Sequence, residues 1–208
     1  MATGRTTDAG GYGEDVNDGV VVAVLAGGRS TRMGRVKADV DVAGRTMRAH
    51  VLAAVAAAGL DAIEVGGGRG IPDLRAAHRG PLAGVEAALT ATEGPAVIAV
   101  AVDQPWLLPA TLRALAAGEG DAFVPYADGK PQVTCARYAA GCLPAATQLL
   151  DAGLGSIQGL LAEIQTVLVP PEVWATWGED GRSWFSADTA EAVAAGLGAF
   201  GAPGTLHP

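Results

Sequence analysis

Short apolar runs alternate with alanine-rich, amphipathic segments along most of the chain, and this alternation predicts strands that alternate with helices. Val20–Leu25 is rich in β-branched residues and unbroken until Gly27, and Ala96–Val102 is equally apolar, so both are predicted to be buried central strands. Further strands are predicted at Ala62–Val65, Ala122–Pro125, Gln132–Arg137 and Thr166–Val169.

Capping residues indicate where the helices between these strands begin and end. Thr46 can cap a helix that runs to Ala58, with Gly59 as its stop, and Pro81 fits the first turn of a helix that ends near Thr92. The other predicted helices are Pro109–Ala117, Leu143–Asp151, Ser156–Glu163 and Thr189–Leu197.

Strands and helices in this order predict an α/β fold, a three-layer α/β/α sandwich with a mostly parallel, Rossmann-like sheet and right-handed crossovers. In such a sheet, ligands bind beyond the carboxyl ends of the strands. The candidate site residues are therefore expected just after Leu25, Val65 and Val102.

The composition narrows the class of protein. The 208 residues are 50% hydrophobic and 17% charged, with a mean hydropathy of +0.28, which suits one globular domain over residues 20–197. Residues 1–19 are polar and aperiodic and are predicted to be a disordered leader, and residues 198–208 a loose tail. The longest apolar run, Val51–Ala58, is too short to span a bilayer, and the leader has no apolar core typical of a secretory signal, so a cytoplasmic location is expected.

The charge and the cysteines exclude further classes. A net charge of −8 argues against nucleic-acid binding or anionic-membrane binding through bulk charge. Cys135 and Cys142 cannot build a disulfide framework or a zinc site by themselves, so they are interpreted as a core residue and a helix-start residue.

The loop after the first predicted strand is positively charged, although the chain as a whole is negative. Two glycines, Gly27 and Gly28, precede four cations within nine residues and no acid: Arg29, Arg32, Arg35 and Lys37. Glycines let backbone N–H groups approach an anion closely, and cations complete a polyphosphate site. The spacing matches neither G-x-G-x-x-G nor a P-loop. A glycine-rich turn with solvated arginines remains the alternative.

The same loop, L-A-G-G-x-S-x-R-M-G-x-x-K, resembles the signature of nucleotidyltransferases related to molybdenum cofactor guanylyltransferase, whose fold is of the nucleotide-diphospho-sugar transferase type. The resemblance implies that Leu25, Ala26, Gly27 and Gly28 wrap the triphosphate of a nucleotide. It also implies catalytic cations at Lys37, which would contact the phosphates, and at Arg32. Val36 replaces an aspartate that the family usually has before the lysine.

The loop after the second predicted strand contains Asp73 and the motif G-P-L-A-G, which begins at Gly80 and Pro81. The glycines and the proline allow a flat base to approach the backbone, and a carboxylate accepts two hydrogen bonds from guanine that adenine cannot donate. The alternative is a helix cap or a surface acid. In the resembling family the matching aspartate recognises guanine. Gly66 or Gly67 stands where that family has an asparagine.

Asp103 follows the third predicted strand, in the sequence V-D-Q-P. An acid at the end of a buried strand is unfavourable unless it meets a cation or water, and Mg²⁺ prefers one or two carboxylates together with phosphate oxygens. A simple strand-end turn is the alternative. The motif is similar to the metal-binding aspartate of the family, which implies that Asp103 binds both Mg²⁺ and nucleotide.

Two segments of the C-terminal half carry weaker signals. Lys130, in the turn D-G-K-P, resembles a hairpin residue that reaches the acidic groups of the second substrate, or it is simply solvated. W-F-S-A-D-T-A-E resembles the family's segment before its last helix, which implies a second metal ligand at Asp188. The alternative is that Asp188 or Thr189 caps the helix. Ser186 replaces the first asparagine of the family's segment.

The resemblance implies that GMP passes from MgGTP to a terminal phosphate of molybdenum-molybdopterin, with release of pyrophosphate. Partner proteins that donate the cofactor or accept the product are a further expectation. An anionic phosphate needs no strong general base, which agrees with the lack of a Ser/His/Asp or G-x-S-x-G constellation. Two alternatives remain, a transferase that uses CTP or another phosphorylated acceptor, and an inactive nucleotide-binding regulatory domain.

Overall fold

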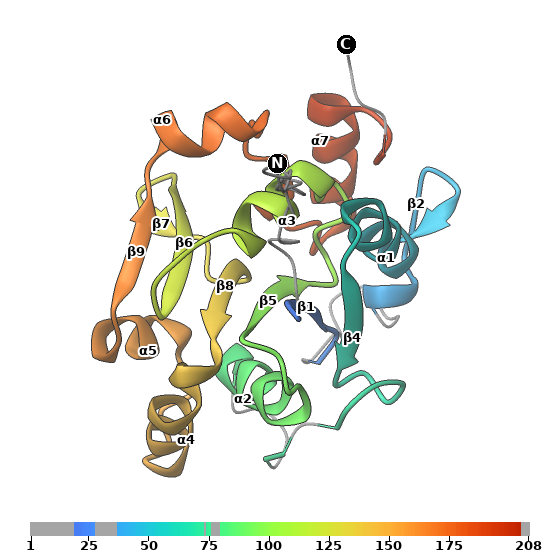
Figure 1. Cartoon of the computed structure of the whole chain (residues 1–208). Helices are drawn as coiled ribbons and strands as arrows, with labels where there is room; N and C mark the ends of the chain where they lie inside the picture. The colour runs from blue at the N-terminus through green and yellow to red at the C-terminus, as the bar shows by residue number, and fades with distance from the viewer. Residues whose placement is uncertain (1–18, 28–36, 73, 76–79, 205–208) are drawn as a thin grey trace, which may run out of the picture.

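The two most apolar runs of the sequence form the centre of the sheet. The computed structural model describes residues 19–27, 37–72, 74–75 and 80–204. Strand β1 (Val21–Leu25) lies between β4 (Asp61–Val65) and β5 (Ala96–Ala101), and all three are parallel (Figure 1). Every residue of β5 except the last is buried, as expected for a strand covered on both faces.

The other half of the sheet is mixed in direction. It contains β6 (Ala122–Ala127), β7 (Lys130–Pro131), β8 (Cys135–Ala139) and β9 (Thr166–Val169). The order is β4-β1-β5-β8-β6-β7, with β9 parallel to β6, and β8 runs antiparallel to both of its neighbours. The three-layer α/β class is confirmed, but the sheet is less parallel than predicted. The connection from β6 to β8 is too short for a parallel crossover, which needs a dozen or more residues.

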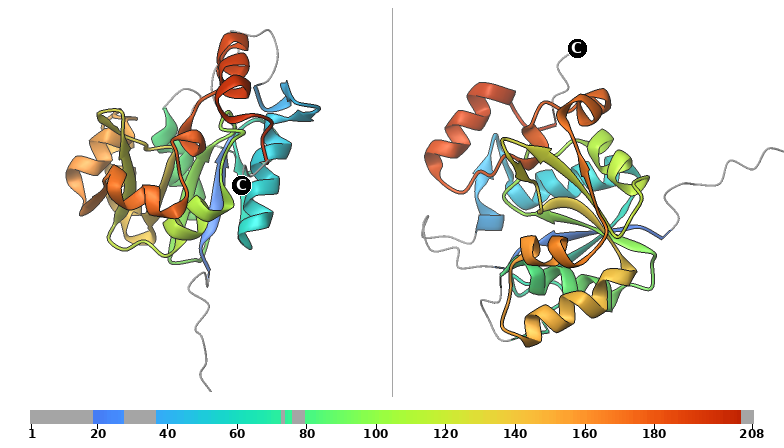
Figure 2. Two further views of the ribbon diagram at one scale, coloured as in Figure 1. Left: turned by 90° about the horizontal axis from the view of Figure 1, so that it is seen from above. Right: turned by 90° about the vertical axis from the view of Figure 1, so that its left-hand side faces the viewer.

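Helices cover both faces of the sheet (Figure 2, right). Alternate residues of the central strands pack on opposite faces, with Val22 and Ile98 in one core cluster and Ala23 and Val97 in the other. Helices α1 (Met47–Ala58) and α3 (Pro109–Ala116) cover the first face. Helices α2 (Pro81–Ala91), α4 (Leu143–Asp151) and α5 (Ile157–Glu163) cover the second.

The predicted helix caps are present. Thr46 Oγ1 accepts a hydrogen bond from the Ala49 amide at 3.2 Å, and Gly59 ends α1 with φ +75°. Pro81 occupies the first turn of α2. These three positions confirm the predicted limits of α1 and the predicted start of α2.

Short elements that the apolar pattern did not indicate complete the fold. They are the hairpin of β2 (Asp41–Val42) and β3 (Arg45–Thr46), helix α6 (Pro171–Trp174), and four 3₁₀ turns, η1 (Lys37–Asp39), η2 (Ala140–Cys142), η3 (Ala175–Trp177) and η4 (Arg182–Trp184). Helix α7 (Ala190–Phe200) and the hairpin lie beyond the carboxyl end of β1 (Figure 2, right).

The predicted tail begins too early. Helix α7 continues past Leu197 to Phe200, and the indole N–H of Trp106 donates a hydrogen bond to the carbonyl oxygen of Gly201 at 2.8 Å. Phe200 and Gly201, which were predicted to belong to the loose tail, therefore contact Trp106 of the domain. The predicted leader lies outside the described residues except for Gly19. Among the described helices, none has the length and apolar character that crossing a bilayer requires.

Candidate functional site

Backbone hydrogen bonds join the segments that follow β1, β4 and β5. The amide of Val102 donates to the carbonyl oxygen of Leu25 at 3.2 Å, and the amide of Ala26 donates to that of Val65 at 2.9 Å. The loops that follow these strands therefore start side by side, where ligands bind in sheets of this kind. Leu25 and Ala26 are partly buried at this edge.

Lys37 and Asp103 meet at this edge although they are far apart in the sequence. Lys37 Nζ lies 2.9 Å from Asp103 Oδ2, and the two side chains are 27% and 13% exposed. Lys37 begins the turn η1, and Asp103 lies in the turn directly after β5. Sequence analysis predicted both residues for one site, and the structure brings them together.

The segment before α7 reaches the same carboxylate. Ser186 Oγ donates a hydrogen bond to Asp103 Oδ2 at 3.1 Å, and the Ala187 amide donates to the Asp103 carbonyl oxygen at 2.8 Å. Asp188 follows directly and is partly buried. Thr189 caps α7, since its hydroxyl accepts from the Ala192 amide at 3.1 Å. Ser186 thus contacts Asp103 itself, although it replaces a family asparagine.

Two glycines in the predicted site are required by the backbone. Gly67 has φ +66°, and a Cβ there would lie 3.0 Å from Cβ of Ala26. Gly80 has φ +74°, and a Cβ would lie only 2.5 Å from the carbonyl oxygen of Gly155. Any larger residue would strain the conformation and separate packed segments. Gly80 and Pro81 therefore keep the start of α2 close to its neighbours.

Several predicted residues cannot be placed. Gly28, Arg32 and Asp73 lie outside the described residues. Lys130 is exposed at the hairpin between β6 and β7. The structure therefore brings Leu25, Ala26, Lys37, Asp103 and the 186–188 segment to one edge of the sheet, and the roles of all these residues stay predictions.

An ion-pair network that the sequence analysis missed holds Arg75, in the loop between β4 and α2, against α2 and α4. Arg75 donates to both carboxylate oxygens of Glu86, with Nε–Oε2 and Nη2–Oε1 distances of 2.9 and 2.6 Å, and also contacts Asp151. Thr147 Oγ1 donates to Glu86 Oε1 at 3.0 Å. Glu86 is the only charged residue in the apolar helix α2, and this isolation was the available signal, because a buried charge needs a partner.

This network predicts a loss of stability in acid. The hydrogen bonds from Arg75 are the main cause that lowers the pKa of Glu86. The folded state therefore holds this proton less tightly than the unfolded chain, so the contribution is present above the unfolded pKa, about 4.3, and disappears as the pH falls through the folded pKa. We expect the urea concentration at the unfolding midpoint to decrease as the pH is lowered below about 5. Glu86→Gln should remove part of this pH dependence. Equal pH slopes in the two proteins would contradict this.

The cysteines and His50 play structural roles. Cys135 and Cys142 are buried, and burial raises the pKa of both thiols, that of Cys142 to about 11. Both are thus poor nucleophiles at neutral pH, which agrees with their interpretation as packing residues. His50 is buried on α1, and its Nε2 lies 2.7 Å from the Val42 carbonyl oxygen, which links α1 to the β2–β3 hairpin.

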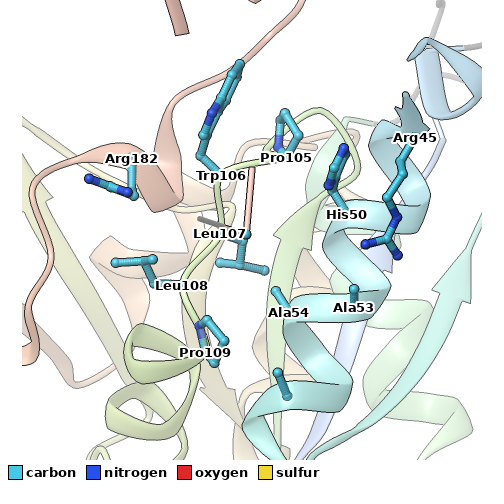
Figure 3. A pocket seen from close by; sticks show the side chains of 12 residues that line it. Arg45, His50, Ala53, Ala54, Pro105, Trp106, Leu107, Leu108, Pro109 and Arg182 are labelled. Carbon is cyan, nitrogen blue, oxygen red and sulfur yellow. The ribbon is translucent and has the colours of Figure 1, made fainter. Parts of the chain in front are cut away.

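A cavity of about 340 Å³ lies between α1 and the segment that leads from Asp103 into α3 (Figure 3). Its lining is mostly apolar, with the side chains of Arg45 and Arg182 on different elements around it. The lining residues are Arg45, His50, Ala53, Ala54, Ala57, Pro105, Trp106, Leu107, Leu108, Pro109, Arg182 and Gly204. None of the predicted nucleotide or metal residues is among them, so this cavity is distinct from the Lys37–Asp103 edge.

Metal-ligating side chains do not gather into a cluster in the described part of the chain. In residues 19–27, 37–72, 74–75 and 80–204, no group of three or more His, Cys, Asp or Glu side chains could hold a metal ion. Within the described residues, Asp103 therefore does not belong to a complete all-protein metal site.

Comparisons with known proteins identify the family and the fold. Residues 22–167 match the family model described as "MobA-like NTP transferase domain", a span that includes Lys37 and Asp103. A probable molybdenum cofactor guanylyltransferase of Pelotomaculum thermopropionicum is 34% identical over 140 residues, which are 62% of this chain and 68% of that protein.

Solved structures share the fold at lower identity. Molybdopterin-guanine dinucleotide biosynthesis protein A from Archaeoglobus fulgidus has a TM-score of 0.72 at 24% identity, over 85% of this chain and 96% of that one. The 2-C-methyl-D-erythritol 4-phosphate cytidylyltransferase of Thermus thermophilus has a TM-score of 0.61 at 17% identity, over 86% of this chain and 96% of that one. Because the family model spans more than half of the sequence, the chain belongs to the MobA-like NTP transferase family and is a nucleotidyltransferase.

Proposed function

We propose that this chain transfers GMP from GTP to the terminal phosphate of molybdopterin carrying molybdenum, and releases pyrophosphate. The observation that carries the proposal is the meeting of Lys37 and Asp103 at 2.9 Å, where the loops after β1 and β5 adjoin. Family membership and the name of the 34% identical relative support the choice of substrates.

The reaction requires a phosphate oxygen of the acceptor to attack the α-phosphorus of GTP. The bond from this phosphorus to the bridging oxygen breaks, and pyrophosphate leaves with the electron pair. The attacking oxygen is already anionic, so the protein needs to supply position and charge neutralisation rather than a base. Lys37, with Gly27 and Gly28 before it, would bind the β- and γ-phosphates, and Arg32 would add a second cation.

The residues present fit a magnesium ion. Mg²⁺ takes hard oxygen ligands, commonly one or two carboxylates together with phosphate oxygens and water. Asp103 and Asp188 would supply such carboxylates, because the hydrogen bond from the Ala187 amide to the Asp103 carbonyl oxygen brings their backbones close together. A magnesium ion held by these residues would neutralise the negative charge that develops on the departing pyrophosphate.

A direct assay tests the proposal. We expect magnesium-dependent uptake of GTP in calorimetry, and pyrophosphate release when molybdopterin carrying molybdenum is added. CTP and ATP serve as matched nucleotides in both measurements. Release with CTP rather than GTP would indicate a cytidylyltransferase, and GTP binding without any release would indicate a regulatory domain. Either result would overturn the proposal.

Base recognition by Asp73 is testable separately. The carboxylate would accept hydrogen bonds from N1–H and the exocyclic amine of guanine, a pair that adenine does not donate. We expect Asp73→Asn to reduce the preference for GTP over ATP by about tenfold or more, since an unmatched buried polar group costs about 1–3 kcal/mol. The measurement is the ratio of the two nucleotide affinities. An unchanged ratio would exclude Asp73 from base recognition.

A further inference from the structure

A buried carboxylate lies behind the candidate site, in a segment that the sequence analysis left without a role. Glu179 is only 4% exposed. Its Oε1 accepts hydrogen bonds from the backbone amides of Asp180, Gly181 and Ser183, at 3.1, 2.8 and 3.2 Å. These three bonds fold the chain between η3 and η4 around the carboxylate. A buried carboxylate that accepts this many hydrogen bonds is held firmly in one position.

A chain of hydrogen bonds connects Glu179 to the start of α3. The Leu108 amide donates to Ser183 Oγ at 2.9 Å, Ser183 Oγ donates to Thr111 Oγ1 at 3.4 Å, and Thr111 Oγ1 donates to Glu179 Oε2 at 2.5 Å. Thr111 and Ser183 are completely buried. We call these four residues, Leu108, Thr111, Glu179 and Ser183, the buckle. It fastens residues 108–111 to residues 179–183.

Both fastened segments lead directly to the candidate site. Residues 103–108 run from the site to the buckle through Gln104, Trp106 and Leu107, which are all buried. Residues 183–187 run back to the site, where Ser186 and Ala187 contact Asp103. Between the two ends, the rings of Trp106 and Phe185 pack edge to face with centroids 5.6 Å apart. Figure 3 shows Leu108 and Arg182, one from each segment, beside the same cavity.

We propose that Glu179 is a positioning residue for the transfer reaction, which holds the 186–188 segment against Asp103 through the buckle. This inference rests on the proposed function, because it assigns a consequence to the placement of Asp103. The hydrogen bonds described for Glu179 go to Thr111 and to the amides of residues 180, 181 and 183. Glu179 therefore acts indirectly, through residues 103–108 and 183–187. These two segments are joined at one end by the buckle and at the other end by the contacts of Ser186 and Ala187 with Asp103.

The proposal predicts a specific kinetic pattern. GTP would be bound mainly by the loop after β1 and by the start of α2, neither of which belongs to the buckle. Loosening the buckle would therefore misplace Asp103 relative to the 186–188 segment while the main contacts to the nucleotide stay in place. A misplacement of about 1 Å can reduce the rate by about 10²-fold. We expect kcat to fall while KM for GTP stays unchanged.

The experiment compares four variants with the wild-type chain. Glu179→Ala removes the carboxylate, and Ser183→Ala is a milder break that keeps Glu179 and its bond to Thr111. Glu179→Gln is the conservative variant, since its amide can still accept the backbone N–H bonds and face the Thr111 hydroxyl. Asp180→Asn is the matched control, because it changes charge in the same turn while its side-chain partner, Arg182, lies outside the buckle.

Amide hydrogen exchange supplies a readout apart from activity. The Ala187 amide is protected by its bond to the Asp103 carbonyl oxygen, so its exchange reports the contact directly. We expect Glu179→Ala and Ser183→Ala to speed exchange at Ala187 relative to amides of β5, and to lower kcat by about tenfold or more at constant KM for GTP. We expect Glu179→Gln to retain most of both properties, and Asp180→Asn to match the wild type.

Two failures are distinguishable. If the wild-type chain neither binds GTP nor releases pyrophosphate, the proposed function fails, whereas the exchange at Ala187 still tests the buckle. If the wild type is active and the Glu179→Ala and Ser183→Ala variants show only a lower melting temperature, with normal kcat and normal protection at Ala187, Glu179 is merely structural and the inference is overturned.

Discussion

Replacement of Asp103 by asparagine is expected to reduce pyrophosphate release from GTP by about 10²- to 10³-fold, the loss typical of removing one electrostatic contact to a transition state. The side chain keeps its shape but loses the charge that pairs with Lys37 at 2.9 Å and that would hold a magnesium ion. Ser186 can still donate to the amide oxygen, so the fold should persist. Initial rates at saturating GTP and acceptor measure the effect.

Asp128→Asn is the matched control for this variant. It removes the same charge from an exposed turn, where the backbone has φ +52°, a conformation that asparagine also tolerates. We expect it to retain the wild-type rate. Asp103→Asn should also unfold within a few degrees of the wild type in a thermal scan. A variant at Asp103 with normal turnover would remove this residue from the catalytic machinery and leave its bond to Lys37 as a structural contact.

Substitution of Gly196 by alanine is expected to destabilise the protein by about 1–3 kcal/mol, the usual effect of overpacking a close-packed site. Gly196 is buried in α7, and a Cβ there would lie 2.3 Å from the nearest ring atom of Trp106. The movement of this ring is restricted, because Trp106 is only 2% exposed and its indole N–H is hydrogen-bonded to the Gly201 carbonyl oxygen. The ring also packs against Phe185 and Phe200. Thermal unfolding should shift down by roughly 2–4 °C per kcal/mol.

Gly198 on the same helix supplies the opposite control. A Cβ at Gly198 would meet nothing within 4 Å. Alanine is favoured over glycine in a helix by about 1 kcal/mol, so Gly198→Ala should raise the melting temperature slightly. Because both variants share the helix propensity gain, their difference isolates the contact with Trp106. Equal stabilisation by the two alanines would show that α7 does not press on this ring.

Much of the architecture followed from local sequence. The unbroken apolar runs predicted β1 and β5, and the caps at Thr46, Gly59 and Pro81 predicted the limits of two helices. The direction of β8 did not follow, because a strand carries the same alternation whether its neighbour is parallel or antiparallel. Helix α7 also ended later than predicted, since the contact of Gly196 with Trp106 and the bond of Trp106 to Gly201 stabilise a glycine-containing stretch that propensity alone disfavours.

The candidate site, too, could be predicted from the sequence only in part. Lys37 and Asp103 were recognisable because a cation-rich glycine loop and an acid at a buried strand end are unusual, and parallel strands bring their carboxyl ends to one edge. The Arg75–Glu86 network and the buckle were not recognised. Their side-chain members are ordinary polar residues whose partners lie on distant segments, and only Glu86, alone in an apolar helix, gave a local sign that it required a partner.

The amino-acid sequence by itself determined which segments become the main strands and helices, because these depend on neighbouring residues and on backbone geometry, and it predicts which loops bind phosphate. The tertiary structure alone decided that Ser186 contacts Asp103, that Glu86 is neutralised by Arg75, and that Glu179 fastens two segments behind the site. Such contacts depend on distances between residues far apart in the chain, and a buried polar group finds its partner only when the core has closed around it.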